Sequence, residues 1–163
     1  MAHARAVIEH VPDHRRALDR MISAVRAGGW LLVEDVDFGG VMTAALSRYV
    51  HPDQHSALAG RMYQAVEAVF SAAGADAGFG ARLPGMLSRA GLEEVGAEVH
   101  TPVVAGGTES WVRGTAEQLA GRLAGTGLVT ADDVAQFLSL TAAPSSFYTP
   151  PLMVSAWGRR PSG

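Results

Sequence analysis

Residues 3–38 decide the fold, and they read HARAVIEHVPDHRRALDRMISAVRAGGWLLVEDVDF. Residues 2–7 are short and apolar enough for the end of a buried strand, and a proline and an aspartate follow, which favour a helix start. The run WLLV at 30–33 is nearly unbroken in hydrophobicity, as expected of a parallel strand covered on both faces. The stretch therefore predicts a strand, a helix and a second strand.

The helix between the two strands is marked at both ends. Asp13 stands where an N-cap residue is expected, and Gly28 with Gly29 closes the helix. One face of this helix is apolar, because large side chains recur three or four residues apart: Leu18, Met21, Ile22 and Val25.

The rest of the chain continues the alternation of helices and strands. The pattern predicts a loop with one helical turn over 37–52, helices over 53–73, 81–90, 110–124 and 131–140, and strands over 95–99 and 152–157. Thr130 is the expected N-cap of the last helix. No repeat or linker interrupts this order, so we expect one α/β domain over 1–163.

Composition narrows the class of protein. The chain has 163 residues, 48% of them hydrophobic, which is enough for a sizeable core. Its formal net charge of −3 argues against nucleic acid or an anionic membrane as a partner. Cysteine is absent, and no apolar run is long enough to span a membrane. We expect a soluble, cytoplasmic protein.

Three short segments carry a resemblance to a known family. They are AGGWLLVED at 27–35, LSRAGLEEV at 87–95 and the closing VSAWGR at 154–159. In this order and at this spacing, they resemble the C-terminal half of class I S-adenosylmethionine-dependent methyltransferases. The resemblance covers nearly the whole chain.

The resemblance implies a partial Rossmann-like sheet with helical insertions. The family has a seven-stranded sheet of order 3-2-1-4-5-7-6 with strand 7 antiparallel. This chain would supply strand 4 from about Ala2, strand 5 at 30–35, strand 6 at 94–101 and strand 7 at 151–158. It would thus be the truncated, substrate-side half, without the glycine-rich loop and the acidic residue that bind S-adenosylmethionine. We do not expect it to bind that cofactor alone.

The resemblance places the family's active crevice at the carboxyl end of the first strand. Arg5 and Glu9 would then lie on the cofactor side, and His10 would be catalytic. An imidazole can orient a substrate hydroxyl or act as a general base, because imidazole titrates near neutral pH. The alternatives are a histidine that binds backbone at a helix entry, and a surface ion pair for Arg5.

Glu34 and Asp35 end the second strand, where open α/β sheets place their ligands. Alternation along a strand turns only one of them toward a crevice. That carboxylate is a candidate catalytic group, which would accept a proton from the methyl acceptor. The alternative is that the pair caps the following loop. We predict no metal site, because no histidine stands at a defined spacing from these acids.

The helix at 53–73 and the segment 105–149 correspond to the family's substrate-covering insertions. Four aromatic residues there are candidates for an apolar substrate pocket: Tyr63, Trp111, Phe147 and Tyr148. The alternative is that these rings belong to the core.

Two functions follow from the resemblance. The first is methyl transfer to a small molecule, which needs the missing half from another chain or an oligomeric partner. The second is a homologue without methyl transfer that binds a small molecule as an auxiliary protein or catalyses a cofactor-independent reaction. In both, the first strand is an open sheet edge, which invites pairing with another chain. We therefore expect a homo-oligomer or a complementing chain at this strand.

Overall fold

The chain divides into two compact units. The computed structural model describes residues 1–39, 44–107 and 110–163. Unit 1 joins three segments, Met1–Asp37, Gly74–His100 and Leu152–Gly163, and unit 2 joins Phe38–Ala73 with Thr101–Pro151. Because each unit is described by itself, the expectation of one domain over 1–163 stays a prediction.

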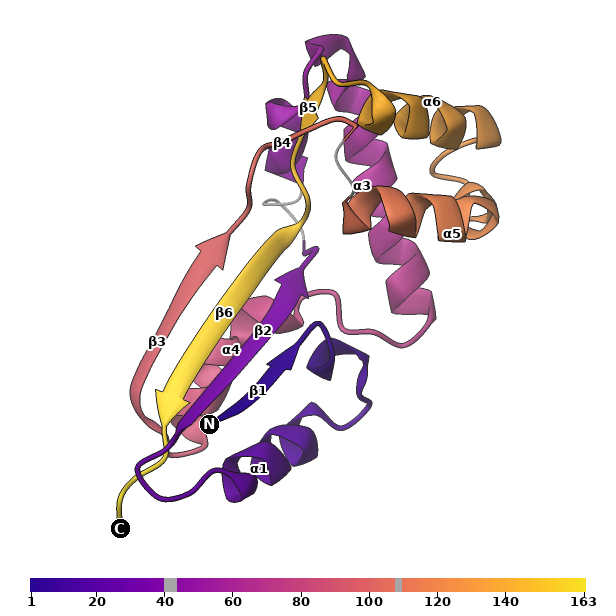
Figure 1. Ribbon diagram of the computed structural model, residues 1–163. Coiled ribbons are helices and arrows are strands. Elements are labelled where there is room, and N and C mark those ends of the chain that lie inside the picture. Colours follow the sequence, from indigo (N-terminus) through magenta and orange to yellow (C-terminus); the bar gives the residue numbers. More distant parts are fainter. Residues whose placement is uncertain (40–43, 108–109) are drawn as a thin grey trace. The chain divides into compact units, whose positions relative to one another are not determined.

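Unit 1 contains a four-stranded mixed sheet. Its strands are β1 (Ala2–Arg5), β2 (Trp30–Asp37), β6 (Leu152–Arg159) and β3 (Glu93–His100), in that spatial order (Figure 1). β1 and β2 are parallel, and β6 runs antiparallel to both β2 and β3. The predicted fold class is confirmed: a mixed sheet whose last strand is antiparallel and lies between two earlier ones. The strand-by-strand correspondence to the family stays a prediction.

Two helices, α1 (His14–Ala24) and α4 (Phe79–Arg89), pack on the sheet of unit 1. The backbone N–H of Arg16 donates to Asp13 at 2.9 Å, which confirms the predicted N-cap. The buried core of this unit lies between the helices and one face of the sheet, and its members are Ile8, Leu18, Val25, Leu31, Val33, Phe79, Leu83, Leu87, Leu92 and Ala156.

The helices cover only one face of the sheet, so two predictions about strand burial were wrong. The run 30–33 was expected to be covered on both faces, but Trp30 is 37% exposed and Leu32 is only half-buried, while Leu31 and Val33 are buried. The strand end at 2–7 was expected to be buried, but β1 alternates between half-buried and exposed residues. The reason is that Ala2 and Ala4 pack against the core on the helix-covered face, whereas His3 and Arg5 lie on the opposite face beside Leu32 and Glu34.

Unit 2 is mostly helical. The predicted helix at 53–73 begins as a 3₁₀ turn, η3 (Asp53–His55), and continues as α3 (Ser56–Ala72). The loop predicted over 37–52 includes residues 40–43, which lie outside the described part, and its later portion contains the turn η2 (Ser47–Tyr49). Two short strands pair antiparallel, β4 (Val104–Ala105) and β5 (Phe147–Tyr148), and the sequence pattern did not predict them.

The other helices of unit 2 are α5 (Trp111–Gly125) and α6 (Ala131–Ala142). Thr130 caps α6 as predicted, and it forms a capping box with Asp133, since each side chain binds the other residue's backbone N–H. Tyr63 and Phe137 pack edge to face in the interior, with ring centroids 6.4 Å apart. Among the described residues, no helix has the length and apolar character needed to cross a membrane.

Candidate functional site

The turn after β1 is tied to the end of β2 by a buried carboxylate. The backbone N–H of Val7 donates to Oδ1 of Asp35 at 2.9 Å, and Asp35 is fully buried. Burial raises the pKa of Asp35 to about 6, although the backbone N–H groups of Val7, Glu9 and Ile8 oppose the rise. Oδ2 of Asp35 is buried and has no hydrogen-bond partner among the described residues. Asp35 thus holds the turn in place, and it faces the protein interior.

Glu9 is a second buried acid in the same turn, within the 3₁₀ helix η1 (Ile8–His10). It is 5% exposed. Burial, followed by the charges of Asp35 and Asp76, raises the pKa of Glu9 to about 8, and a hydrogen bond with the backbone of Val36 opposes the rise. At neutral pH, the Glu9 carboxyl is therefore mostly protonated.

His10 is the half-exposed member of this group. Its Nε2 lies 3.2 Å from Oε1 of Glu9, and its side chain is 45% exposed. The structure thus brings together three of the predicted site residues, Glu9, His10 and Asp35, in unit 1. Their assigned catalytic and cofactor roles stay predictions.

Three further residues, His14, Asp76 and Arg82, adjoin this group and were not among the predicted site residues. Nδ1 of His14 lies 3.6 Å from Oδ2 of Asp76, and the backbone N–H of Asp76 donates to the carbonyl of Glu9 at 2.9 Å. Arg82 forms an ion pair with the same Asp76 carboxylate. No sequence pattern predicts this contact, because Asp76 lies in a glycine-flanked segment that indicates only a break before α4.

Glu34 points to the other face of the sheet, as alternation along β2 requires. It accepts hydrogen bonds from His3 at 2.7 Å and Ser155 at 2.8 Å, and it lies 3.6 Å from Arg5. Burial by itself raises the Glu34 pKa, but Ser155, His3 and Arg5 together lower it below its usual value. Arg5 thus forms the ion pair considered as its alternative interpretation, and Glu34 does not join His10.

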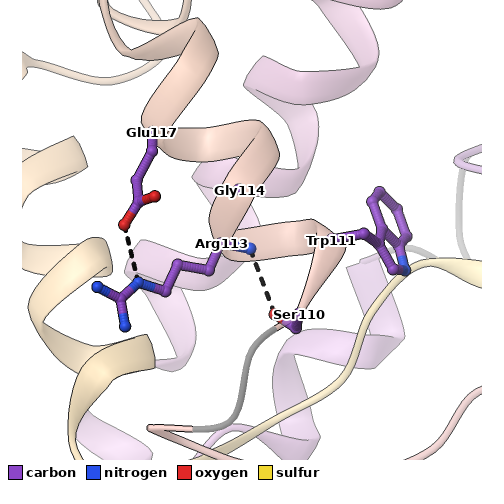
Figure 2. Close-up of a pocket in the computed structure, with 5 residues that line it drawn as sticks. All are labelled: Ser110, Trp111, Arg113, Gly114 and Glu117. Atoms are coloured by element: carbon purple, nitrogen blue, oxygen red, sulfur yellow. Dashed lines mark hydrogen bonds and ion pairs between the residues drawn. The ribbon is translucent and has the colours of Figure 1, made fainter.

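A pocket of about 560 Å³ opens at the start of α5 in unit 2, and Figure 2 shows its lining residues. Ser110 caps the helix by accepting from the backbone N–H of Arg113 at 3.3 Å. Arg113 donates to Glu117 at 2.8 Å, one helical turn later. Gly114 leaves open space between them, because a Cβ there would meet nothing within 4 Å. Ser110, Arg113 and Glu117 were not among the site residues predicted from the sequence.

The four predicted pocket aromatics have different environments. Tyr63 and Tyr148 are buried at 2% and 0% exposure, which agrees with the alternative core interpretation. The Tyr63 hydroxyl donates to the carbonyl of Thr149 at 2.7 Å, and burial raises its pKa to about 12. Phe147 is 44% exposed, and Trp111, 43% exposed, borders the pocket at α5. Of the four, Trp111 alone lines that pocket.

Tyr148 contacts Ser110 of the pocket lining, and this contact gives a first prediction. Its hydroxyl lies 2.6 Å from Oγ of Ser110, the residue that caps α5. We expect Tyr148→Phe to lower the free energy of unfolding by about 1 kcal/mol, since a partly buried hydrogen bond is lost. Urea denaturation measures this, with Tyr49→Phe as the control at a 59% exposed site. Equal stability of the two variants would contradict the role given to Tyr148.

Comparison with known proteins gives short sequence matches. No family model matches the chain. Two proteins of Strobilurus tenacellus, Methyltransferase str2 and Methyltransferase str3, are 47% identical to it over 36 and 38 residues. The matches cover 22% and 23% of this chain, but only 13% and 14% of those relatives.

A solved structure was also compared with the chain. It comes from Bacillus halodurans C-125 and was described as a methyltransferase candidate. The match covers 98% of this chain and 68% of that one, with 18% sequence identity and a TM-score of 0.49. The predicted resemblance to methyltransferases is supported by the two curated relatives.

Proposed function

We propose that this chain is the substrate-side half of a class I S-adenosylmethionine-dependent methyltransferase that acts on a small molecule in the cytoplasm. The sheet of unit 1 carries the proposal, because β6 lies antiparallel between β2 and β3 and β1 lies parallel beside β2. This is the arrangement that the resemblance implies for strands 4, 5, 7 and 6. The local identity to two methyltransferases adds support.

The residues of unit 1 do not form a cradle for S-adenosylmethionine on their own. β1 and β2 are its parallel pair, and ligands of open α/β sheets bind at the carboxyl ends of such strands. At that end, the turn AVIEH at 6–10 has no glycine, and Asp35 already occupies the N–H of Val7. Glu9 and Asp35 are buried beneath the turn. We therefore derive no step of methyl transfer from this chain alone.

We expect a further strand to pair with β1. Among the described residues β1 pairs only with β2, so its other side offers backbone groups to another strand, and the neighbouring residue Val7 is 48% exposed. A complementing chain or a second copy would cover this edge. A homogeneous 17.0 kDa monomer in light scattering, under conditions where cofactor binds, would contradict the need for a partner.

A chimera tests the function. We expect calorimetry to detect no binding of S-adenosylmethionine to this chain alone. Placing the first three strands of a class I methyltransferase ahead of Met1 should restore binding, since it supplies the cofactor cradle. The control is the same chimera with Val7→Pro, which removes the N–H bound by Asp35. A folded chimera without binding, judged by circular dichroism, would overturn the proposal.

The second candidate is small-molecule binding without methyl transfer. It is supported by the pocket at α5, which lies wholly within unit 2 and does not involve the turn after β1. In that case, the chimera would fail to bind cofactor, whereas the chain alone would bind a ligand that quenches the fluorescence of Trp111.

A further inference from the structure

A groove lies in unit 1 between α1 and α4, and we call it the α1–α4 groove. Its volume is about 480 Å³, which is within the range of small-molecule sites. The residues that line it are Arg15, Leu18, Asp19, Met86, Arg89 and Ala90. None of these six belongs to the sheet or to the turn at 6–10, so the groove is separate from the site described above.

The α1–α4 groove has an apolar floor and a charged rim. Leu18 is 2% exposed and Met86 is half-buried. Arg15, Asp19 and Arg89 are exposed, and two arginines against one aspartate leave the rim with a formal charge of +1. The floor favours the apolar part of a ligand, and the rim favours a negatively charged group.

The two arginines of the rim have no carboxylate partner among the described residues. Asp19 follows Arg15 by one turn of α1, a spacing at which ion pairs form, but these two side chains form none. Because Arg15 and Arg89 line the same groove, their positive charges repel each other, and an anion between them would remove this repulsion. Their guanidinium donors are thus available to a ligand.

Gly85 allows the Arg89 guanidinium to lie along α4. A Cβ at Gly85 would lie 3.1 Å from Nη1 of Arg89 and 3.7 Å from its Cζ and Nη2. The guanidinium therefore packs over the bare backbone one turn earlier, instead of extending into solvent. Arg89 also stands in the last turn of α4, where a positive charge is favourable, but this role does not depend on a groove.

We propose that the α1–α4 groove binds a small monocarboxylate with an apolar body. The carboxylate would accept charge-assisted hydrogen bonds from Arg15 and Arg89, since the planar guanidinium matches its geometry. The apolar body would cover Leu18 and Met86. A single negative charge is preferred, because a larger anion would bring further negative charge toward Asp19. This site goes beyond the proposed methyl transfer and does not rest on it.

Octanoate is the probe, and the native chain is titrated with it in nuclear magnetic resonance. We expect the methyl signal of Met86, assigned by its loss in Met86→Leu, to shift and to saturate. Octan-1-ol has the same chain length without the charge, and it should bind at least about tenfold more weakly. This comparison needs no variant to fold.

Substitution of the arginines tests their part in the site. Arg15→Gln and Arg89→Gln should each weaken octanoate binding about tenfold, because a charge-assisted hydrogen bond is lost. The matched control is Arg122→Gln, which removes an exposed arginine from the last turn of another helix, α5. It should leave the affinity unchanged.

Three results would overturn the inference. One is equal affinity for octanoate and octan-1-ol. Another is unchanged affinity in Arg89→Gln, shown to be folded by urea denaturation, since Arg89 would then serve the helix end alone. The third is binding to phosphatidylglycerol vesicles without a saturable shift by free octanoate, which would make the groove a membrane contact. Because no measurement uses S-adenosylmethionine, failure here would leave the proposed function standing.

Discussion

Replacing Glu9 with glutamine is expected to remove most of the loss of stability between pH 4.5 and pH 8. The pKa of Glu9 is 4.5 in an ordinary environment and about 8 in the fold. Below pH 4.5 both states hold the proton, and the native fold has its full stability. As the pH rises, the unfolded chain releases this proton first, so the free energy of unfolding falls until the folded group also ionises near pH 8.

The expected size of this effect is on the order of 2 to 4 kcal/mol for a buried carboxyl. Asp35 contributes in the same direction over a lower window, from pH 3.8 to about 6. Glutamine cannot ionise, so Glu9→Gln should be as stable as the native chain at pH 4.5 and more stable at pH 8. Urea denaturation across this range measures the difference, and Glu98→Gln, at an exposed site on β3, is the matched control. Equal free energies of unfolding of the native chain at pH 4.5 and pH 8 would contradict the raised pKa of Glu9.

Gly80→Ala is expected to destabilise unit 1 by about 2 kcal/mol, because the new methyl group has no room. A Cβ at Gly80 would lie 2.8 Å from the carbonyl oxygen of Asp35 and 2.9 Å from that of Val36. These are backbone atoms of β2, so α4 would have to move away from the sheet. The same shift would disturb the turn held by Asp35.

Gly114→Ala gives the matched comparison. This glycine also lies within a helix, α5, but a Cβ there would meet nothing within 4 Å. We expect a gain of about 0.5 to 1 kcal/mol, since alanine favours helix more than glycine does. Thermal and urea denaturation of both variants separate the effect of helix propensity from the effect of the close backbone approach at Gly80. Destabilisation by both substitutions to the same extent would show that close approach is not the reason at Gly80.

The sequence predicted the elements well where periodicity or an end signal was strong. Asp13 and Thr130 cap helices as expected, and the strands at 30–37, 93–100 and 152–159 lie where the apolar runs indicated. β4 and β5 have two residues each, which is too short for a period to appear. Exposure of Trp30 could not be predicted, because an apolar strand does not reveal how many of its faces are covered.

The candidate site was predicted in part. Glu9, His10 and Asp35 could be placed together because the carboxyl ends of parallel neighbours meet at one edge of a sheet. The contact of Asp76 with Glu9 could not be predicted, because it joins segments that are more than sixty residues apart in the chain. The protonation state of Glu9 could not be predicted from the sequence either, since its raised pKa results from burial beside two other acids.

The position of β6 has a consequence for how the chain is made. This strand, at 152–159, follows both β2 and β3 in the chain, yet it separates them in the sheet. During synthesis, β2 and β3 are made before their shared partner, and their unpaired edges are open to wrong pairing until β6 is made. The helices α5 and α6 of unit 2 are neighbours in the chain and contact each other, so this pair can form before β6 is made. The sheet of unit 1 is therefore completed later in synthesis than the α5–α6 pair.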